Sequence, residues 1–361
     1  MKSAFRLGLG VALAAFLLWL ATRGVDPAAL LAAIAQAKPL PLLLVVVLTV
    51  VMYLIRAMRW RLLLPALKNA PIFDLFAITN IGFMAGLVIP RAGEVLRPYL
   101  AARRYKVGVS AGFASIILER LMDLLTVLFL LACYMFVLPR PAAERSDAIM
   151  TTLRAGAGLV FVVALAGAGF LAALRVEGGL ARRLLDRALG ILPSGLGVKV
   201  RGLVSSFISG LDVFGSSPAQ WARLIGESVL LWVVIGAIIH LNSMAFGFDI
   251  PFQSAFLIIA FLTVGVAIPT PGMVGGFHAS YTLALTAIYG VDQGKAVAAG
   301  LALHALQNLP VLILGLAFLG REGLSFGSMR RISTGSPEEK PQPPEDKPQP
   351  PKEPPAGDQG A

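Results

Sequence analysis

The chain has few of the side chains from which disulfides, metal centres and acid–base catalytic sites are built. It contains one cysteine and three histidines in 361 residues. The lone Cys133 allows no disulfide within the chain, and no Cys or His spacing typical of a metal site occurs. The sequence also contains no phosphate-binding loop, catalytic triad or paired-carboxylate motif. We therefore expect neither an enzyme nor a bound cofactor or metal.

Charged residues are scarce as well, at 14% of the chain against 57% hydrophobic residues. Soluble domains have about 25% and 45–50% of these classes. The charges are clustered, which leaves apolar runs of about 20 residues, the length of helix that crosses a hydrocarbon core. The candidate spans are residues 4–22, 39–58, 116–138, 155–174, 224–246 and 296–319. The sequence thus predicts an all-α polytopic membrane protein whose first span is retained, because no convincing cleavage site follows it.

One apolar motif occurs twice, 179 residues apart. Residues 86–95 read GLVIPRAGEV and residues 265–274 read GVAIPTPGMV, so Gly, Ile, Pro, Gly and Val recur in register. Proline and glycine interrupt a helix and release backbone groups that hydrocarbon does not satisfy. Two such breaks at corresponding positions of two halves are typical of transporters built from inverted repeats.

The basic residues predict the topology. The net charge of +11 comes from short loops beside apolar spans, which does not indicate nucleic-acid binding. Lysine and arginine cluster at residues 2–6, 56–68, 103–106, 175–201 and 321–331. By the positive-inside rule these clusters and both termini are cytoplasmic, and residues 139–154 lie outside. We expect a multi-pass protein of the bacterial cytoplasmic (inner) membrane.

This path gives the two motif copies opposite orientations. Residues 69–102 start and end beside cytoplasmic clusters, whereas residues 253–292 start and end outside. Two architectures satisfy the pattern: about six full spans with two re-entrant hairpins, or eight spans if the hairpin arms cross the membrane. The inversion follows in either case.

Two segments differ in composition from the membrane domain, which is predicted to cover residues 1–331. Residues 176–222 mix Arg, Gly and Ser with short amphipathic patches, which indicates a cytoplasmic connector with an interfacial helix. Residues 332–361 are rich in Pro, Glu and Lys and have almost nothing apolar to bury, so this tail is predicted to be disordered.

Three groups of charged residues lie close to apolar segments. Arg56, Arg59 and Trp60 share one helix face, either as an interface anchor that snorkels to the headgroups or as a contact for a lipid phosphate. Arg91, Glu94 and Arg97 follow the first break. Glu94 and Arg97 could pair, and Arg91 stands where the hairpin reaches furthest into the core. A polar cavity explains such charges better than an interfacial loop.

The third group is Glu119, Arg120 and Asp123, at the start of a predicted span and close to its cytoplasmic edge. Glu119 and Asp123 are spaced i, i+4 and would repel each other on one face. A cation is therefore expected between them, and Arg91 or Arg97 could supply it.

The second break carries no charge. It consists of Pro269, Thr270, Pro271 and Gly272, and His278 follows six residues after Gly272. A lone histidine in a helix is more often a hydrogen-bonded packing residue than a proton relay, and both readings are kept for His278.

Together these motifs resemble the flippase-like membrane domain of lysylphosphatidylglycerol synthases. The resemblance covers about residues 5–320 and rests on four segments in order. These read RxxRW from Arg56, IPRAGExxR from Ile89, ERxxD from Glu119 and PTPG from Pro269. Met273 and His278 depart from the family pattern, which has Gly and Glu at these places, so a carboxylate role there is in doubt.

The resemblance implies a lipid-translocating module without the aminoacyl-transferase domain of the full synthases. The expected substrate is a phospholipid or polyprenyl-phosphate-type lipid, and the expected contacts are the charged residues above with the second break and His278. The alternative is a non-transporting membrane subunit that binds anionic lipid or regulates a lipid-modifying enzyme. Lipids with anionic headgroups are the expected partners, with a membrane protein or a second copy of the chain as further candidates.

Overall fold

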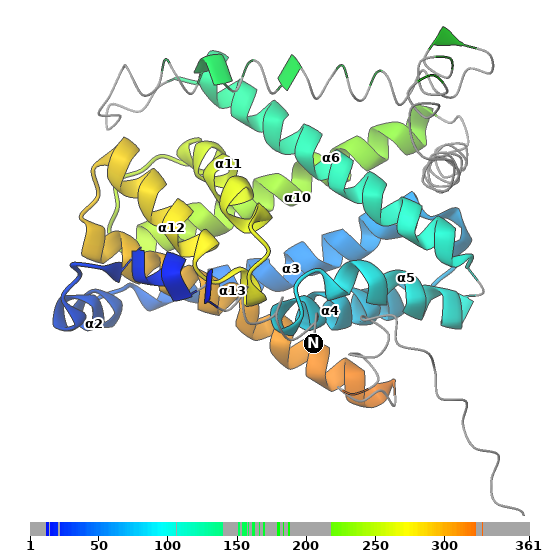
Figure 1. The fold of residues 1–361 in the computed structure, drawn as a ribbon, viewed down its shortest axis with the longest axis horizontal. Coiled ribbons are helices and arrows are strands. Elements are labelled where there is room, and N and C mark those ends of the chain that lie inside the picture. Colours follow the sequence, from blue (N-terminus) through cyan, green and yellow to red (C-terminus); the bar gives the residue numbers. More distant parts are fainter. Residues whose placement is uncertain are drawn as a thin grey trace, which may run out of the picture.

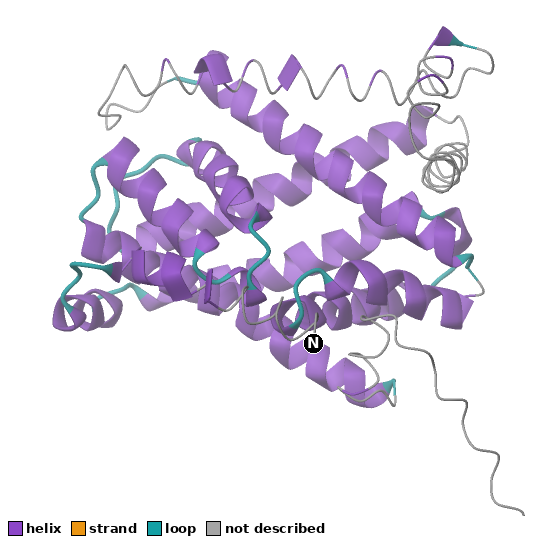
Figure 2. Ribbon diagram, viewed as in Figure 1, coloured by secondary structure: helices purple, strands orange, loops and turns teal. Residues whose placement is uncertain are grey.

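The computed structural model describes residues 22–105, 107–139 and 218–322, with isolated residues in 12–20 and 151–187 and at 327. Helices joined by loops make up these residues, and no strand occurs among them (Figure 2). The predicted spans 4–22 and 155–174, the connector up to residue 217 and the tail lie outside the continuous described ranges. Their assignments remain predictions.

The described helices fall into two sets with the same order of long and short members. A short helix, α2 (Pro27–Ala35), precedes them. The first set is α3 (Pro39–Leu63), α4 (Ile72–Val88), α5 (Ala92–Tyr105) and α6 (Val109–Phe136). The second set is α10 (Pro218–Ala245), α11 (Ser254–Ala267), α12 (Gly276–Leu283) and α13 (Gln293–Arg321). Short turns η1 (Pro65–Leu67), η2 (Pro271–Met273) and η3 (Ala284–Ile288) connect or extend them.

Three described helices are long and apolar enough to cross a membrane. They are α3, α10 from Ala219 and α13, whereas α4 and α11 are apolar but shorter. Helix α6 has 28 residues, about 42 Å of helix. Its apolar sequence is interrupted by Glu119, Arg120 and Asp123. The structure therefore confirms an all-helical membrane protein in which each motif copy separates two short helices.

Local sequence explains where several helices begin. The carboxylate of Asp26 accepts a hydrogen bond from the amide of Ala28 at 3.0 Å at the start of α2. Asp292 accepts one from the amide of Lys295 at 3.0 Å at the start of α13. Both are N-caps, and proline at the first position of α2 and α3 fits the turn that has no internal amide partner.

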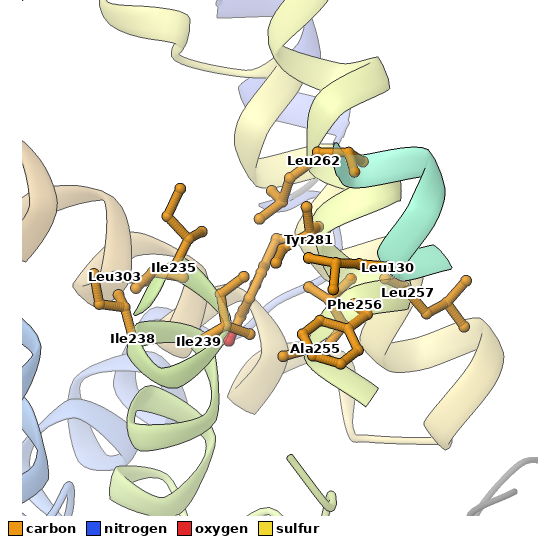
Figure 3. Close-up of a cluster of buried hydrophobic side chains, with 14 of the residues drawn as sticks. Leu130, Ile235, Ile238, Ile239, Ala255, Phe256, Leu257, Leu262, Tyr281 and Leu303 are labelled. Atoms are coloured by element: carbon orange, nitrogen blue, oxygen red, sulfur yellow. The ribbon is translucent and has the colours of Figure 1, made fainter. Parts of the chain in front are cut away.

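The two sets pack against each other in matching pairs. Helix α3 packs along α10, and α13 packs on α4 and α3 in the way that α6 packs on α11 and α10. In Figure 1, α6 crosses the upper part of the view and α13 the lower part, with α11 and α12 on the left and α4 and α5 to their right. A buried cluster joins α6, α10, α11 and α12, with Leu130, Ile239, Phe256 and Tyr281 among its members (Figure 3).

Each pair of short helices crosses at two glycines. A Cβ atom on Gly93 would overlap the carbonyl oxygen of Gly82, and one on Gly276 would overlap that of Gly265. Both crossing pairs are 183 residues apart, whereas the prolines are 179 apart. The expected residue-by-residue match of the two Ile-Pro-x-x-Gly segments is therefore wrong by about one helical turn at the crossing. The helix break and the close approach occupy different places along each arm.

Gly93→Ala is expected to lower the free energy of unfolding by about 1–3 kcal/mol, the usual cost of overpacking. The added methyl group meets backbone, which cannot move aside as a flexible side chain would. Thermal unfolding of the purified protein measures the effect. Gly86→Ala is the matched control, because a Cβ there meets nothing within 4 Å. Equal melting temperatures for the two variants would contradict the crossing.

Different contacts tie the open ends of the two hairpins to the last long helix of the other set. Arg104 on α5 forms ion pairs with Asp74 on α4, at 2.8 Å, and with Glu322 directly after α13. Tyr105 also donates a hydrogen bond to Asp74 at 2.8 Å. At the end of α12, the hydroxyl of Tyr289 lies 2.9 Å from that of Tyr134 on α6. One tie is ionic and the other is a pair of hydroxyl groups.

Candidate functional site

The strongest contact of the site joins α5 to α6. Both terminal nitrogens of Arg97 donate to the carboxylate of Glu119, at 3.1 Å to Oε1 and 2.9 Å to Oε2. Arg97 and Glu119 are almost completely buried, with side-chain exposures of 2% and 0%. This fork-to-fork geometry is the strong form of a charge-assisted pair. It fixes the first hairpin to the long helix that follows it.

Helix α3 supplies two more arginines to the same carboxylates. Nη1 of Arg59 lies 2.7 Å from Oδ1 of Asp123, and its Nη2 lies 3.9 Å from Oε1 of Glu119. Nη1 of Arg56 lies 3.6 Å from Asp123 and 3.9 Å from Glu119. The cation expected between the two carboxylates is therefore present, and α3 and α5 both provide it.

Arg120 completes the set at its edge. Its side chain is 44% exposed and lies 3.0 Å from Glu119 and 3.5 Å from Asp123. We call the six side chains the arginine network; its members are Arg56, Arg59, Arg97, Glu119, Arg120 and Asp123. Four guanidinium groups share two carboxylates, so the arginine network carries two positive charges in excess.

Aromatic rings frame the arginine network. The guanidinium carbon of Arg97 lies 4.5 Å from the ring centre of Trp60 and 5.7 Å from that of Phe83. Arg56 lies 5.2 Å from the same Phe83 ring. Such rings attract cations electrostatically and also exclude water. They stabilise positive charge where no further carboxylate is supplied by the described residues.

Helix α10 brings the second set of helices into the site. The indole of Trp232 donates to Oδ1 of Asp123 at 3.1 Å, and the hydroxyl of Ser228 accepts from Nη1 of Arg59 at 3.4 Å. Both contacts join residues more than 100 positions apart. Movement of one set of helices relative to the other therefore changes the surroundings of Arg59 and Asp123.

The indole of Trp60 is held by one hydrogen bond, to Ser115 on α6 at 2.9 Å. Trp60→Phe keeps a ring beneath Arg97 but removes the donor, so we expect a loss of about 1 kcal/mol in the free energy of unfolding. Ser115→Ala should cost a similar amount. The double variant, measured by thermal unfolding, should cost less than the sum of the singles. Strict additivity would show that the bond contributes nothing.

The structure corrects two expectations about depth. Trp60 and Arg59 have 0% exposure and Arg56 has 7%, so this group does not snorkel to an interface. Packing against α6 and α10 is the cause. Helix α6 begins at Val109, ten residues before Glu119, so this carboxylate lies about 15 Å along the helix rather than at its edge.

Arg91 and Glu94 do not belong to the arginine network. Arg91 is exposed at the tip between α4 and α5, where its φ is 63°, and Glu94 is half-buried. Neither makes an ion pair with another residue of the described part of the chain. The pair considered for Glu94 and Arg97 is also absent, because Arg97 is occupied by Glu119.

The second break forms a separate polar group. Thr270 is buried, and its hydroxyl donates to the carbonyl oxygen of Val274 at 2.8 Å. Pro269 precedes it, and Pro271 and Gly272 begin the η2 turn, which packs on α4. A Cβ on Gly272 would lie 3.5 Å from the carbonyl oxygen of Leu87, so the tips of the two hairpins meet.

His278 lies behind this tip. It is buried, and its Nδ1 accepts a hydrogen bond from the amide of Gly275 at 3.3 Å. Its ring centre lies 4.8 Å from that of His304, whose Nε2 is 2.8 Å from the carbonyl oxygen of Gly272. These contacts fit a hydrogen-bonded packing residue and make His304 the link between α13 and the second break.

Several residues of these sites were not identified from the sequence. Phe83, Ser115, Ser228, Trp232 and His304 carry no motif, and Ser228 and Trp232 lie far along the chain from the charges they contact. An intramembrane polar side chain was the available signal for Ser228 and His304.

Comparisons with known proteins agree with this arrangement of motifs. Residues 7–315 match the family described as the lysylphosphatidylglycerol synthase TM region. A curated relative, the glycosyltransferase AglD of Haloferax volcanii, is 28% identical over 337 residues. The match covers 85% of this chain and 53% of that protein, so the chain spans about half the length of the relative.

Proposed function

Because the chain belongs to the family of the lysylphosphatidylglycerol synthase TM region, we propose that it moves the headgroup of an anionic lipid from one leaflet of a membrane to the other. The headgroup passes between the two sets of helices, and the arginine network is its binding site. A phospholipid and a polyprenyl-phosphate-type lipid both present the phosphate that this site requires.

The observation that carries the proposal is the buried excess of positive charge. Five of the six side chains in the arginine network expose 9% or less of their surface. Charges buried at depth in a membrane protein are costly unless paired, and they mark substrate pathways. The two carboxylates neutralise two guanidinium groups, and an anionic headgroup neutralises the remainder.

The packing of the helices supports an inverted repeat. The first and second sets share the order long, short, break, short, long, and their contacts across the protein match pair by pair. Basic residues place the open end of the first hairpin in the cytoplasm and that of the second outside. Rocking of two such halves about their shared α3–α10 contact is the usual way in which inverted repeats alternate access.

The two sets are unequal in charge. The crossing glycines place Ser280 at the position that corresponds to Arg97, because both pairs are separated by 183 residues. All six members of the arginine network belong to the first set, whereas α10 contributes only neutral side chains. We assign headgroup binding to the first set and the moving frame to the second.

Leaflet exchange of labelled lipids in proteoliposomes that contain only this protein tests the proposal. Accelerated exchange of an anionic lipid over protein-free vesicles is the expected result. Binding of the lipid without any exchange would instead support a non-transporting subunit that presents lipid to an enzyme. The relative AglD, which is named a glycosyltransferase and is about twice as long, gives that second function its support.

A further inference from the structure

We propose that the arginine network selects a lipid phosphate that carries two negative charges, as a phosphate monoester does, and that Arg56 contacts this phosphate directly. The inference rests on the proposed function, because it concerns the lipid that the site receives. It assigns a ligand charge and a contact residue that the sequence leaves open.

The charge count of the site argues for a dianion. Four guanidinium groups and two carboxylates leave an excess of two positive charges, and only Arg120 is substantially exposed, at 44%. Unbalanced charge is costly in a low-dielectric site. A phosphate monoester with two negative charges balances the excess. A phosphodiester with one charge leaves half of it, and a zwitterionic headgroup leaves all of it.

Hydrogen bonding singles out Arg56 as the contact. Arg97 is occupied by Glu119, and Arg59 lies 2.7 Å from Asp123 and donates to Ser228. Arg56 is equally buried, but Nε and Nη1 have no hydrogen-bond partner among the described residues. Its nearest carboxylate oxygen is 3.6 Å away.

A buried guanidinium whose nitrogens lack partners is incomplete without a ligand, because buried donors are normally satisfied. The planar fork of arginine matches two oxygens of a phosphate. The ring of Phe83, 5.2 Å from the guanidinium carbon, lies beside Arg56 and holds its orientation without using its donors. Arg56 is thus the member of the arginine network that is placed and still available.

Arg120 sets the charge excess independently of that contact. It lies at the exposed edge and reinforces carboxylates that already have buried arginine partners. Arg120→Gln lowers the excess from two charges to one and leaves Arg56, Arg59 and Arg97 in place. This variant separates the charge of the site from its geometry.

The test is a competition assay on the full chain in detergent micelles, with labelled phosphatidic acid as the probe. Unlabelled phosphatidic acid, phosphatidylglycerol, phosphatidylcholine and inorganic phosphate compete in separate arms. We expect phosphatidic acid to bind about tenfold or more tightly than phosphatidylglycerol, since each additional charge is matched in a buried site. Phosphatidylcholine should be weaker still, and inorganic phosphate, which lacks acyl chains, should compete poorly.

Three variants sharpen the assay. Arg120→Gln should bring the two anionic lipids to within about threefold of each other, since one excess charge matches a diester. Arg56→Lys keeps the charge but removes the fork, so it should weaken phosphatidic acid and preserve the ratio between the lipids. Arg103→Gln, an exposed arginine outside the network, is the control and should bind as the wild type does.

Each contrary result has a distinct meaning. Equal binding of phosphatidic acid and phosphatidylglycerol by the wild type, or an unchanged ratio in Arg120→Gln, would overturn the charge match. Unchanged affinity in Arg56→Lys would overturn the contact. Competition by inorganic phosphate as strong as by phosphatidic acid would identify a free anion rather than a lipid. Failure of every lipid to bind would reject the proposed function itself.

Discussion

Glu119→Gln is expected to destabilise the protein by about 3–5 kcal/mol, the cost of leaving a buried charge without its partner. Glu119 has 0% exposure and accepts both terminal nitrogens of Arg97. Glutamine has the same size but no charge, so the excess of positive charge in the arginine network rises from two to three. Thermal unfolding of the detergent-solubilised protein measures the loss.

Glu227→Gln is the matched control, because Glu227 pairs with the half-exposed Arg223 at 2.8 Å. A surface pair of this kind contributes about 1 kcal/mol or less. A charge exchange gives a second check. The double variant Arg97→Glu with Glu119→Arg should be more stable than either single variant, since the pair is restored in reverse. A double variant as unstable as the sum of the singles would contradict a direct pair.

Arg56→Met is expected to reduce lipid exchange at least about tenfold while the protein remains folded. The folded state loses no hydrogen bond from Nε or Nη1, because these nitrogens have no partner among the described residues. Replacing a buried charge by an apolar side chain of similar length often leaves stability unchanged or improved. Exchange rates in proteoliposomes, compared at equal protein content, give the measurement.

Arg91→Ala is the comparison for this variant. The sequence singles out Arg91 as the lipid contact because it stands at the helix break, yet its side chain is exposed at the hairpin tip and outside the arginine network. We therefore expect its exchange to stay within about twofold of the wild type, as for surface substitutions away from a site. Loss of exchange in Arg91→Ala with normal exchange in Arg56→Met would reverse the assignment.

The hairpins were predictable because proline and glycine mark a helix end in any context. Pro90 and Pro269 both follow the last turn of a short helix, as expected. The crossing of the arms was not predictable from the same pattern. It depends on Gly82 with Gly93 and Gly265 with Gly276, which are recognised only once the backbones lie against each other. Equal proline positions therefore gave a register that the packing does not share.

The site was predictable in part for a similar reason. Repulsion between Glu119 and Asp123 is a local property of one helix, so the need for a cation between them could be derived from spacing alone. The choice of Arg97 over Arg91 depends on which way α5 leaves the break. Ser228 and Trp232 depend on the packing of α10 against α3 and α6, and no local signal in the sequence encodes that.

The two ties at the hairpin ends respond differently to the surrounding solution. The guanidinium of Arg104 is 38% exposed, so mobile ions reach its pairs with Asp74 and Glu322. At physiological ionic strength the screening length is about 8 Å, and it shortens as salt increases. The hydroxyl pair of Tyr134 and Tyr289 is buried and uncharged, so ionic strength leaves it unchanged. Salt added to the compartment that Arg104 faces loosens that end alone, which makes the ease of opening depend on the ionic composition of one side of the membrane.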